Sequence, residues 1–241
     1  MAEITKYTYR VEPQQVDFTL RASVPSMLDC ILNTAGKDAH NKGFGVEVLQ
    51  QRSLSWVLSR LAVELDRVPE QYEEFSIGTW INDFNRLSST RNFLLESRGE
   101  VFGRAVSQWC MIDLGSRSVA DMSSMADVYR AAMVEAASPC DKPLRLGATE
   151  PQHRTERPVV YSDIDFNRHV NTMRYVEMIF NALPLERIEH NDGVRIDLNF
   201  LAEGRWGQTL IMGHAAEGEV SHFEISSDDG RTLCRARVVW R

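Results

Sequence analysis

The sequence predicts an α+β fold that is built twice along the chain, and three observations lead to this prediction. The 241 residues are 43% hydrophobic and 25% charged, a composition typical of a globular chain with one or two domains. Two segments of the first half, 16–33 and 99–109, resemble 164–181 and 230–240 of the second half, in the same order. In both halves the earlier segment has helical periodicity, and strand-like segments follow it.

Identical residues mark both matches. Asp17 corresponds to Asp165 in the first match, and Trp109 corresponds to Trp240 in the second. Chance similarity seldom keeps chain order twice, so we interpret the halves as two copies of one unit. The expected boundaries are 1–135 for the N-terminal unit, 136–154 for a linker with prolines and mixed polarity, and 155–241 for the C-terminal unit.

In the first copy, alternating and β-branched residues over 5–11 predict a strand. A helix is expected next, because Ser23 can cap it and Pro25 fits its first turn, where a missing N–H costs nothing. Apolar residues then recur at helical spacing, and Asn41 with Gly43 ends the helix. Four longer strands are expected near 54–66, 75–87, 90–98 and 102–114.

The second copy repeats this order. A strand is expected over 156–161, and the helix after it can begin at Asn171 and end before Pro184. The residues 221–226 alternate between polar and apolar, and 227–230 (SDDG) are typical of a hairpin turn. Four strands are expected near 193–202, 207–215, 219–227 and 231–240.

An antiparallel sheet that curls around one central helix is the hotdog arrangement. The two units therefore predict a tandem, or double, hotdog with two antiparallel sheets, each wrapped around a central helix. A helix of about 16 residues is roughly 24 Å long, which is enough to lie along such a sheet.

Charge and composition exclude several classes of function. The formal net charge of −7 disfavours general binding to nucleic acid. The sequence has neither a signal-peptide pattern nor a run of about 18 apolar residues, so we expect no membrane span and a cytoplasmic location. The four cysteines form no C-x-x-C pair, and no cluster has metal-ligand spacing, so we expect neither a metal nor a cofactor.

The most informative polar segment is 161–171, immediately before the second predicted helix. Carboxylates, amides and an imidazole fall there on alternate residues, which share one face of an extended chain. We therefore expect them to converge beside the free N–H groups and partial positive charge of the helix start, a suitable place for a developing oxyanion. The five residues are Asp163, Asp165, Asn167, His169 and Asn171.

A plainer interpretation is a solvated loop in which Asn171 only caps the helix. The internal repeat argues against it. The first copy has Arg21 where the second has His169, and Thr19 where the second has Asn167. Duplication followed by specialisation of the second copy explains this difference, so we favour a functional site.

The segment SDIDFNRHVNTMRYVEMI, residues 162–179, resembles the acyl-(acyl carrier protein) thioesterases, which carry a similar D-x-D-x-N-x-H-x-N stretch. The resemblance extends over most of the chain and includes 43–69, where family members have a helix followed by a strand. It implies a double hotdog fold. It also implies hydrolysis of the thioester that joins a fatty acyl chain to the phosphopantetheine arm of an acyl carrier protein, which releases the fatty acid and ends chain elongation.

The resemblance further implies which residues act. The catalytic Asp, Asn and His of the family fall on Asp165, Asn167 and His169, and a later acidic residue falls on Glu203. Plant members often have Cys directly after that Glu, whereas Gly204 stands here, so a cysteine nucleophile at this point is excluded. We therefore expect direct attack by water. The sequence leaves open which of the Glu, Asp and His residues is the general base.

Two further predictions concern substrate binding. We expect an apolar site for the acyl chain in the first copy, beside Met27, Leu28 and Ile31, although these residues are equally compatible with a core. Acyl carrier proteins are acidic, so a basic patch is expected near the site, with Arg168 and Arg174 as substrate-binding residues. The double hotdog can stand alone or form a homodimer, and the sequence leaves both open.

Three alternative functions remain. One is an acyl-CoA thioesterase, and another is a different hotdog enzyme such as a hydroxyacyl dehydratase. The third is a non-catalytic module that binds acyl ligands. Such a sensor usually needs an effector domain, and the sequence has no DNA-binding helix pair or basic segment outside the two units.

Overall fold

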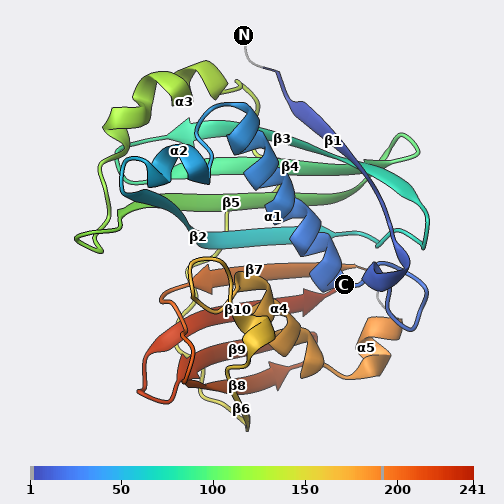
Figure 1. The fold of residues 1–241 in the computed structure, drawn as a ribbon. Helices are drawn as coiled ribbons and strands as arrows, with labels where there is room; N and C mark the ends of the chain where they lie inside the picture. Colours follow the sequence, from blue (N-terminus) through green and yellow to red (C-terminus); the bar gives the residue numbers. More distant parts are fainter. Residues whose placement is uncertain (1–2, 191–192) are drawn as a thin grey trace. The chain divides into compact units, whose positions relative to one another are not determined.

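The computed structural model describes residues 3–190 and 193–241. They form two compact units, Met1–Pro143 (unit 1) and Leu144–Arg241 (unit 2), which are coloured blue to green and yellow to red in Figure 1. The boundary between the units falls within 136–154, the segment expected to be a linker. Each unit has an antiparallel sheet and a central helix, so the predicted α+β double hotdog is confirmed.

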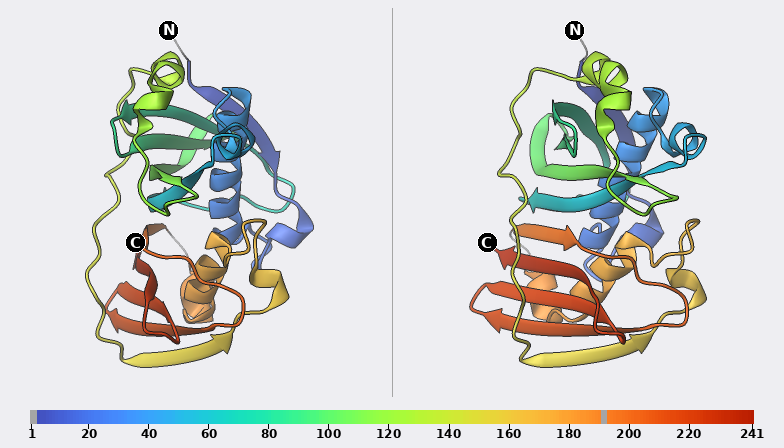
Figure 2. Two further views of the ribbon diagram at one scale, coloured as in Figure 1. Left: turned by 60° about the vertical axis from the view of Figure 1, so that its left-hand side comes forward. Right: turned by 90° about the vertical axis from the view of Figure 1, so that its left-hand side faces the viewer.

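Unit 1 contains one antiparallel sheet with a long helix against it. The strand order is β1 (Thr5–Arg10), β3 (Glu74–Phe84), β4 (Ser89–Ser97), β5 (Glu100–Asp113) and β2 (Leu54–Leu65). The described helices are α1 (Val24–Asn41), α2 (Val46–Gln50) and α3 (Ala126–Ala132), with short 3-10 helices at η1 (Pro13–Gln15) and η2 (Met122–Met125). Figure 2 shows that this sheet bends around α1.

α1 begins and packs as its sequence predicts. The Ser26 N–H donates to the Ser23 hydroxyl at 3.2 Å, so Ser23 is the N-cap. Its apolar stripe is directed into the unit, because Met27, Leu28 and Ile31 are at most 1% exposed. Burial of such a stripe, rather than helix propensity, provides most of the stability of a helix in a protein.

Unit 2 repeats the same plan in fewer residues. The strand order is β7 (Val194–Phe200), β10 (Thr232–Trp240), β9 (Val220–Ser227), β8 (Thr209–Glu217) and β6 (His153–Pro158). The described helices are α4 (Thr172–Asn181) and α5 (Leu185–Glu189), with a 3-10 helix at η3 (Tyr161–Asp163). α4 lies against one face of the sheet (Figures 1 and 2).

The eight longer strands lie within a few residues of their predicted positions. The first strand of unit 2 and some short helices differ from the prediction. The first strand of unit 2 is 153–158, not 156–161. This edge strand is mostly exposed, so it carries no apolar alternation from which its position could be predicted. The short helices α3 and α5 were not expected, because five to seven residues are too few to show a helical period.

Membrane-crossing helices are absent from the part of the chain that the structure describes. None of its helices is both long enough and apolar enough to span a bilayer.

Candidate active site

The polar segment before α4 is a tight hairpin rather than the expected extended chain. Ile164 and Val170 form an antiparallel bridge, and the Asp165 N–H donates to the His169 carbonyl at 2.8 Å. The chain reverses at Arg168, whose φ of 63° lies in the left-handed region. Alternate residues therefore do not share one face. The prediction of an extended chain was wrong, because backbone N–H groups that donate to the Asp165 carboxylate favour a turn.

Asp165 builds this turn with its side chain. Its Oδ1 accepts the N–H of Asn167 at 2.8 Å and the N–H of His169 at 3.1 Å. An Asp that bonds the backbone two residues later is a typical turn former. Asp165 therefore holds the backbone from which the His169 side chain projects, while the side chain of Asn167 is exposed to solvent.

Asp163 has a different role from the one its position suggested. Its carboxylate is buried and receives two hydrogen bonds from Arg157, at 2.7 and 2.9 Å, and one from the Val160 N–H. Burial alone would raise the pKa of Asp163, but the hydrogen bonds from Arg157 and Val160 outweigh it and hold this pKa below its usual range. Asp163 is thus an ionised, buried carboxylate paired with an arginine that is 32% exposed.

Asn171 caps α4, as the plainer interpretation of this residue predicts. Its Oδ1 accepts the Met173 N–H at 2.8 Å, and its own N–H donates to the Asp163 carbonyl. The Arg174 N–H donates to the Asn171 carbonyl at 2.9 Å. Several N–H groups of the helix start therefore already have acceptors, which reduces what this end of α4 can offer an oxyanion.

His169 and Glu203 lie together although 33 residues separate them in the chain. The His169 Nε2 lies 3.2 Å from a Glu203 carboxylate oxygen, and the two side chains are 20% and 31% exposed. Their backbones are also linked, because His169 bridges Arg205 and the Val170 N–H donates to the Gly204 carbonyl at 2.8 Å. An imidazole beside a carboxylate, open to solvent on one side, is suited to acid–base chemistry.

Gly204, the residue after Glu203, contacts Tyr175, which lies on the buried and mostly apolar face of α4. The Gly204 N–H donates to the Tyr175 hydroxyl of α4 at 3.0 Å. A Cβ built on Gly204 would lie 2.8 Å from that oxygen and 3.0 Å from Val170. A cysteine at this position would therefore require the structure to shift. In the sequence, Tyr175 could have been singled out because it carries the one hydroxyl among the buried, otherwise apolar side chains of α4.

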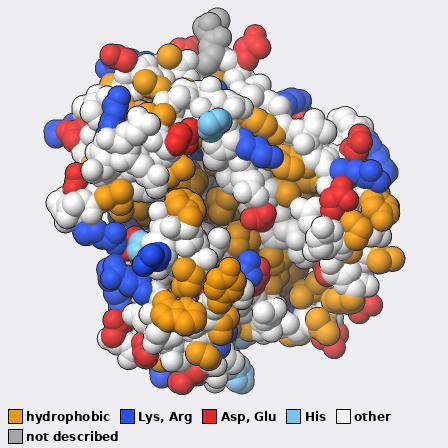
Figure 3. Space-filling model, viewed as in Figure 1, with side chains coloured by type: hydrophobic (Ala, Val, Ile, Leu, Met, Phe, Trp, Pro, Cys, Tyr) orange, Lys and Arg blue, Asp and Glu red, His pale blue; other side chains and the backbone are white. Residues whose placement is uncertain are grey.

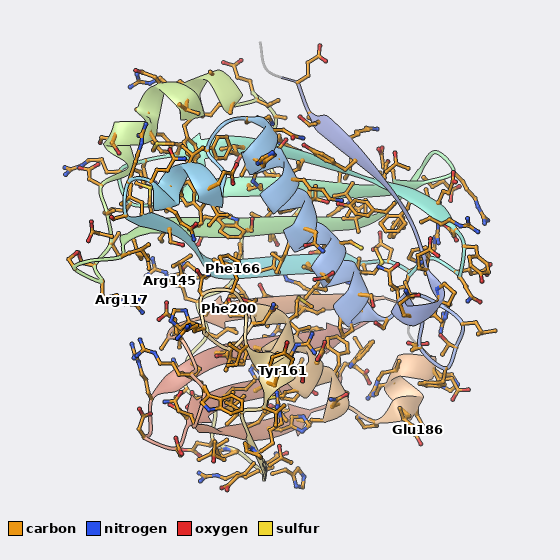
Figure 4. The ribbon with its side chains drawn as sticks, viewed as in Figure 1. Arg117, Arg145, Tyr161, Phe166, Glu186 and Phe200 are labelled. Carbon is orange, nitrogen blue, oxygen red and sulfur yellow. The ribbon has the colours of Figure 1, made fainter. Side chains whose placement is uncertain are left out.

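An exposed surface of aromatic and cationic side chains surrounds the hairpin. Tyr161 is 88% and Phe166 74% exposed, and both project from the loop before α4, where Figure 4 labels them. Arg168 at the turn is also exposed, whereas Arg174 donates to Glu177 at 2.7 Å. Figure 3 shows hydrophobic and basic side chains exposed on the corresponding part of the surface.

The remaining predicted site residues lie in unit 1. Met27, Leu28 and Ile31 are buried on α1, which is the position of core residues. Among the described residues, no three His, Cys, Asp or Glu side chains are arranged to hold a metal ion.

Comparison with known families matches both units. Residues 2–130 match the acyl-ACP thioesterase N-terminal domain, and residues 147–241 match the acyl-ACP thioesterase C-terminal domain. The oleoyl-acyl carrier protein thioesterase 1 of Arabidopsis thaliana is 23% identical over 98% of this chain and 75% of its own length. A Cuphea viscosissima acyl-[acyl-carrier-protein] hydrolase is 22% identical over 98% of this chain and 62% of its own length.

Solved structures agree with this match. The crystal structure of an acyl-ACP thioesterase from Bacteroides thetaiotaomicron has a TM-score of 0.88 and 34% identity, over 99% of this chain and 98% of the other. The 12:0-ACP thioesterase from Umbellularia californica has a TM-score of 0.86 at 20% identity, over 99% and 97% of the two chains, which supports the fold.

Proposed function

Because the chain belongs to the acyl-ACP thioesterase family of thioester hydrolases, we propose that it hydrolyses fatty acyl-(acyl carrier protein). The products are the free fatty acid and the carrier with its phosphopantetheine thiol, so the reaction ends chain elongation. The observation that carries this proposal is the His169–Glu203 pair at 3.2 Å, partly open to solvent beside the hairpin.

The pair is suited to activate water directly. In the proposed step, a water oxygen attacks the thioester carbonyl carbon while the His169–Glu203 pair accepts a water proton. The C–S bond then breaks, and the pair returns a proton to the departing sulfur, so that acid and thiol are released. Asp165 is less suited to be the base, because its Oδ1 already accepts two backbone N–H groups. Its role here is to position His169.

Two amides support this chemistry in different ways. The exposed side chain of Asn167 can donate to the thioester carbonyl or hold the attacking water. Asn171 acts as the cap that fixes the start of α4, because its side chain is bonded to the Met173 N–H.

Binding of the carrier is proposed to involve the exposed surface beside the hairpin. Arg168 is exposed at the turn and can meet an acidic carrier, whereas Arg174 already forms an ion pair with Glu177. The docking proposal therefore rests mainly on Arg168. Binding of the acyl chain beside Met27, Leu28 and Ile31 stays a prediction from the sequence, as do a cytoplasmic location and a homodimer.

A panel of thioesters tests the proposal. The purified protein is incubated with acyl-carrier and acyl-CoA substrates of several chain lengths, and both free thiol and free fatty acid are measured. We expect both products from acyl-carrier substrates, at higher kcat/KM than from acyl-CoA. Faster turnover of acyl-CoA would favour the CoA thioesterase alternative. Loss of water from a hydroxyacyl substrate would favour a dehydratase, and binding without thiol release would favour a binding module.

A further inference from the structure

The peptide groups around Gly204 are held from two sides. The Gly204 carbonyl accepts the Val170 N–H at 2.8 Å, and the Gly204 N–H donates to the Tyr175 hydroxyl at 3.0 Å. Tyr175 is 3% exposed and belongs to α4, so its hydroxyl has a fixed place. Glu203 directly precedes Gly204, so these two hydrogen bonds hold the backbone next to the Glu203 side chain.

Unit 1 has the same backbone arrangement without the catalytic pair. There the Ala22 N–H donates to the Pro69 carbonyl at 2.8 Å, and Arg21 bridges Glu70. Pro69 therefore occupies the position of Gly204, and Val68 occupies that of Glu203.

The hydrogen bond to the helix is also missing in unit 1, and both of its partners are absent. Proline has no N–H to donate, so Pro69 cannot make the bond that Gly204 makes. Met27 stands where unit 2 has Tyr175, and a thioether carries no hydroxyl. The unit that has the His–Glu pair is thus the unit that has both the tyrosine hydroxyl and the N–H it accepts.

From this difference we infer that Tyr175 is a positioning residue, which holds Glu203 against His169 by accepting the Gly204 N–H. The inference rests on the proposed function, because it assigns Tyr175 to the same pair. It also explains why a glycine follows Glu203. A Cβ at position 204 would meet the Tyr175 oxygen at 2.8 Å, Val170 at 3.0 Å and Leu233 at 3.2 Å, so the hydroxyl takes space that a side chain needs.

The electrostatic surroundings keep this hydroxyl neutral. Burial raises the pKa of Tyr175 more than the hydrogen bond from Gly204 lowers it, and the nearby Cys234, Glu203 and Asp165 raise it further. A phenol that stays protonated does not act as a base at neutral pH. It remains a hydrogen-bond acceptor for the Gly204 N–H, which is a positioning task.

The first test removes the hydroxyl alone. In Tyr175→Phe the Gly204 N–H loses its acceptor, so the backbone beside Glu203 loses one of the two hydrogen bonds that hold it. We expect kcat for acyl-carrier substrate to fall about 10- to 100-fold, because small misplacements of catalytic groups have effects of this size. KM should change less than about 2-fold, since Tyr175 is only 3% exposed and offers almost no surface to a carrier. Tyr9→Phe is the matched control, because it removes a hydroxyl bonded to Thr34 at 2.7 Å in unit 1.

The second test uses the crowding at position 204. Gly204→Ala should lower kcat in the presence of Tyr175, because the new methyl group displaces the hydroxyl. In the double variant with Tyr175→Phe the oxygen is gone, so the alanine should add less than about 2-fold to the loss from Tyr175→Phe alone. Losses that are independent of the contact between position 204 and the hydroxyl would instead make the two effects multiply.

Three outcomes decide between the explanations. Wild-type kcat in Tyr175→Phe, or a double variant whose loss is the product of the single losses, would overturn the inference. Equal losses in Tyr9→Phe and Tyr175→Phe, with matching falls in the thermal unfolding midpoint, would also overturn it. His169→Ala separates the two proposals. If His169→Ala retains wild-type turnover, the proposed function of the pair fails. If His169→Ala is inactive while Tyr175→Phe has wild-type kcat, only the positioning role of Tyr175 is rejected.

Discussion

The hairpin before α1 and the hairpin before α4 have the same backbone but carry different side chains. In both, an aspartate Oδ1, from Asp17 or Asp165, accepts the N–H two residues later at 2.8 Å. In both, the residue at the turn has a left-handed backbone, with φ of 59° at Leu20 and 63° at Arg168. The aspartate that the sequence resemblance marks as catalytic is therefore also present in the unit without the proposed catalytic histidine.

The difference lies in what each hairpin presents. Unit 2 places His169 against Glu203 at 3.2 Å, whereas unit 1 has Arg21 and Val68 at the corresponding positions. The residues that form the turn are therefore distinct from the residues that are suited to acid–base chemistry. Residues shared by both hairpins build the loop, and residues found only in unit 2 are the candidates for catalysis.

The largest expected effect tests that separation directly. His169→Ala should lower kcat/KM for acyl-carrier substrate about 100- to 10,000-fold, the usual loss for a removed acid–base group. Arg21→Ala changes the corresponding residue of unit 1 and should alter kcat/KM less than about 3-fold. Both are measured on folded protein, verified by circular dichroism. Near-wild-type turnover in His169→Ala would remove the chemical distinction between the hairpins.

The next effect concerns Asp163, which is paired with Arg157, while unit 1 has the uncharged Gln15 at that position. Asp163→Asn should lower the free energy of unfolding at pH 7 by about 1–3 kcal/mol, because the charged hydrogen bonds are lost. The pKa of Asp163 is lowered in the folded protein. The wild-type advantage is therefore complete above the unfolded-state pKa of about 3.9 and is lost as the pH falls below it.

Urea denaturation between pH 7 and pH 3 measures this advantage. The two unfolding curves should differ at pH 7 and approach each other at the acidic end. A constant difference across that range would show that the ionised carboxylate is not what stabilises the wild type.

A smaller effect distinguishes the turn-forming role of Asp165 from a role as base. Asp165→Asn keeps an oxygen that can accept the Asn167 and His169 N–H groups, so activity should stay within about 10-fold of wild type. Asp165→Ala removes that acceptor and should lower activity about 100-fold, by misplacing the histidine. Asp17→Ala makes the same change in unit 1 and should cost about 1 kcal/mol of stability with little change in kcat. An inactive, folded Asp165→Asn would instead identify Asp165 as a chemical participant.

The smallest effect concerns the residues at the two turns. Arg168→Glu should raise KM for acyl-carrier substrate about 2- to 5-fold, the range of an exposed charge interaction, and should weaken its dependence on salt. Leu20, at the turn of unit 1, is 64% exposed. Leu20→Glu places the same charge there and should leave KM unchanged. Equal effects of both substitutions would indicate general repulsion of the acidic carrier rather than docking at unit 2.

Much of the fold could be predicted because its signals are local. Helical spacing of apolar residues located α1 and α4, and Ser23 and Asn171 cap them as expected. Alternation located the longer strands, and the order of the two matched segments revealed the duplication. The five-residue helix α5 and the exposed strand β6 were missed, because they are too short or too uniformly polar to show a period.

The candidate site was predictable in its residues but not in its geometry. The contrast between copies indicated Asn167 and His169, and the resemblance to a family added Glu203. The expected extended chain was wrong because Asp165 closes a turn. Asp163 and Asn171 were grouped with the chemistry, yet their hydrogen bonds hold Arg157 and the start of α4.

The tandem α+β architecture and the differing residues of the two copies could be predicted from the chain alone, because periodicity and repetition are properties of the sequence. Tertiary structure alone decided that His169 meets Glu203, and that the hydroxyl of Tyr175 accepts the Gly204 N–H. Those contacts join residues about thirty positions apart, and short-range patterns carry no information about such distances. Whether an aspartate positions a histidine or takes its proton depends on hydrogen-bond partners that only the folded chain brings together.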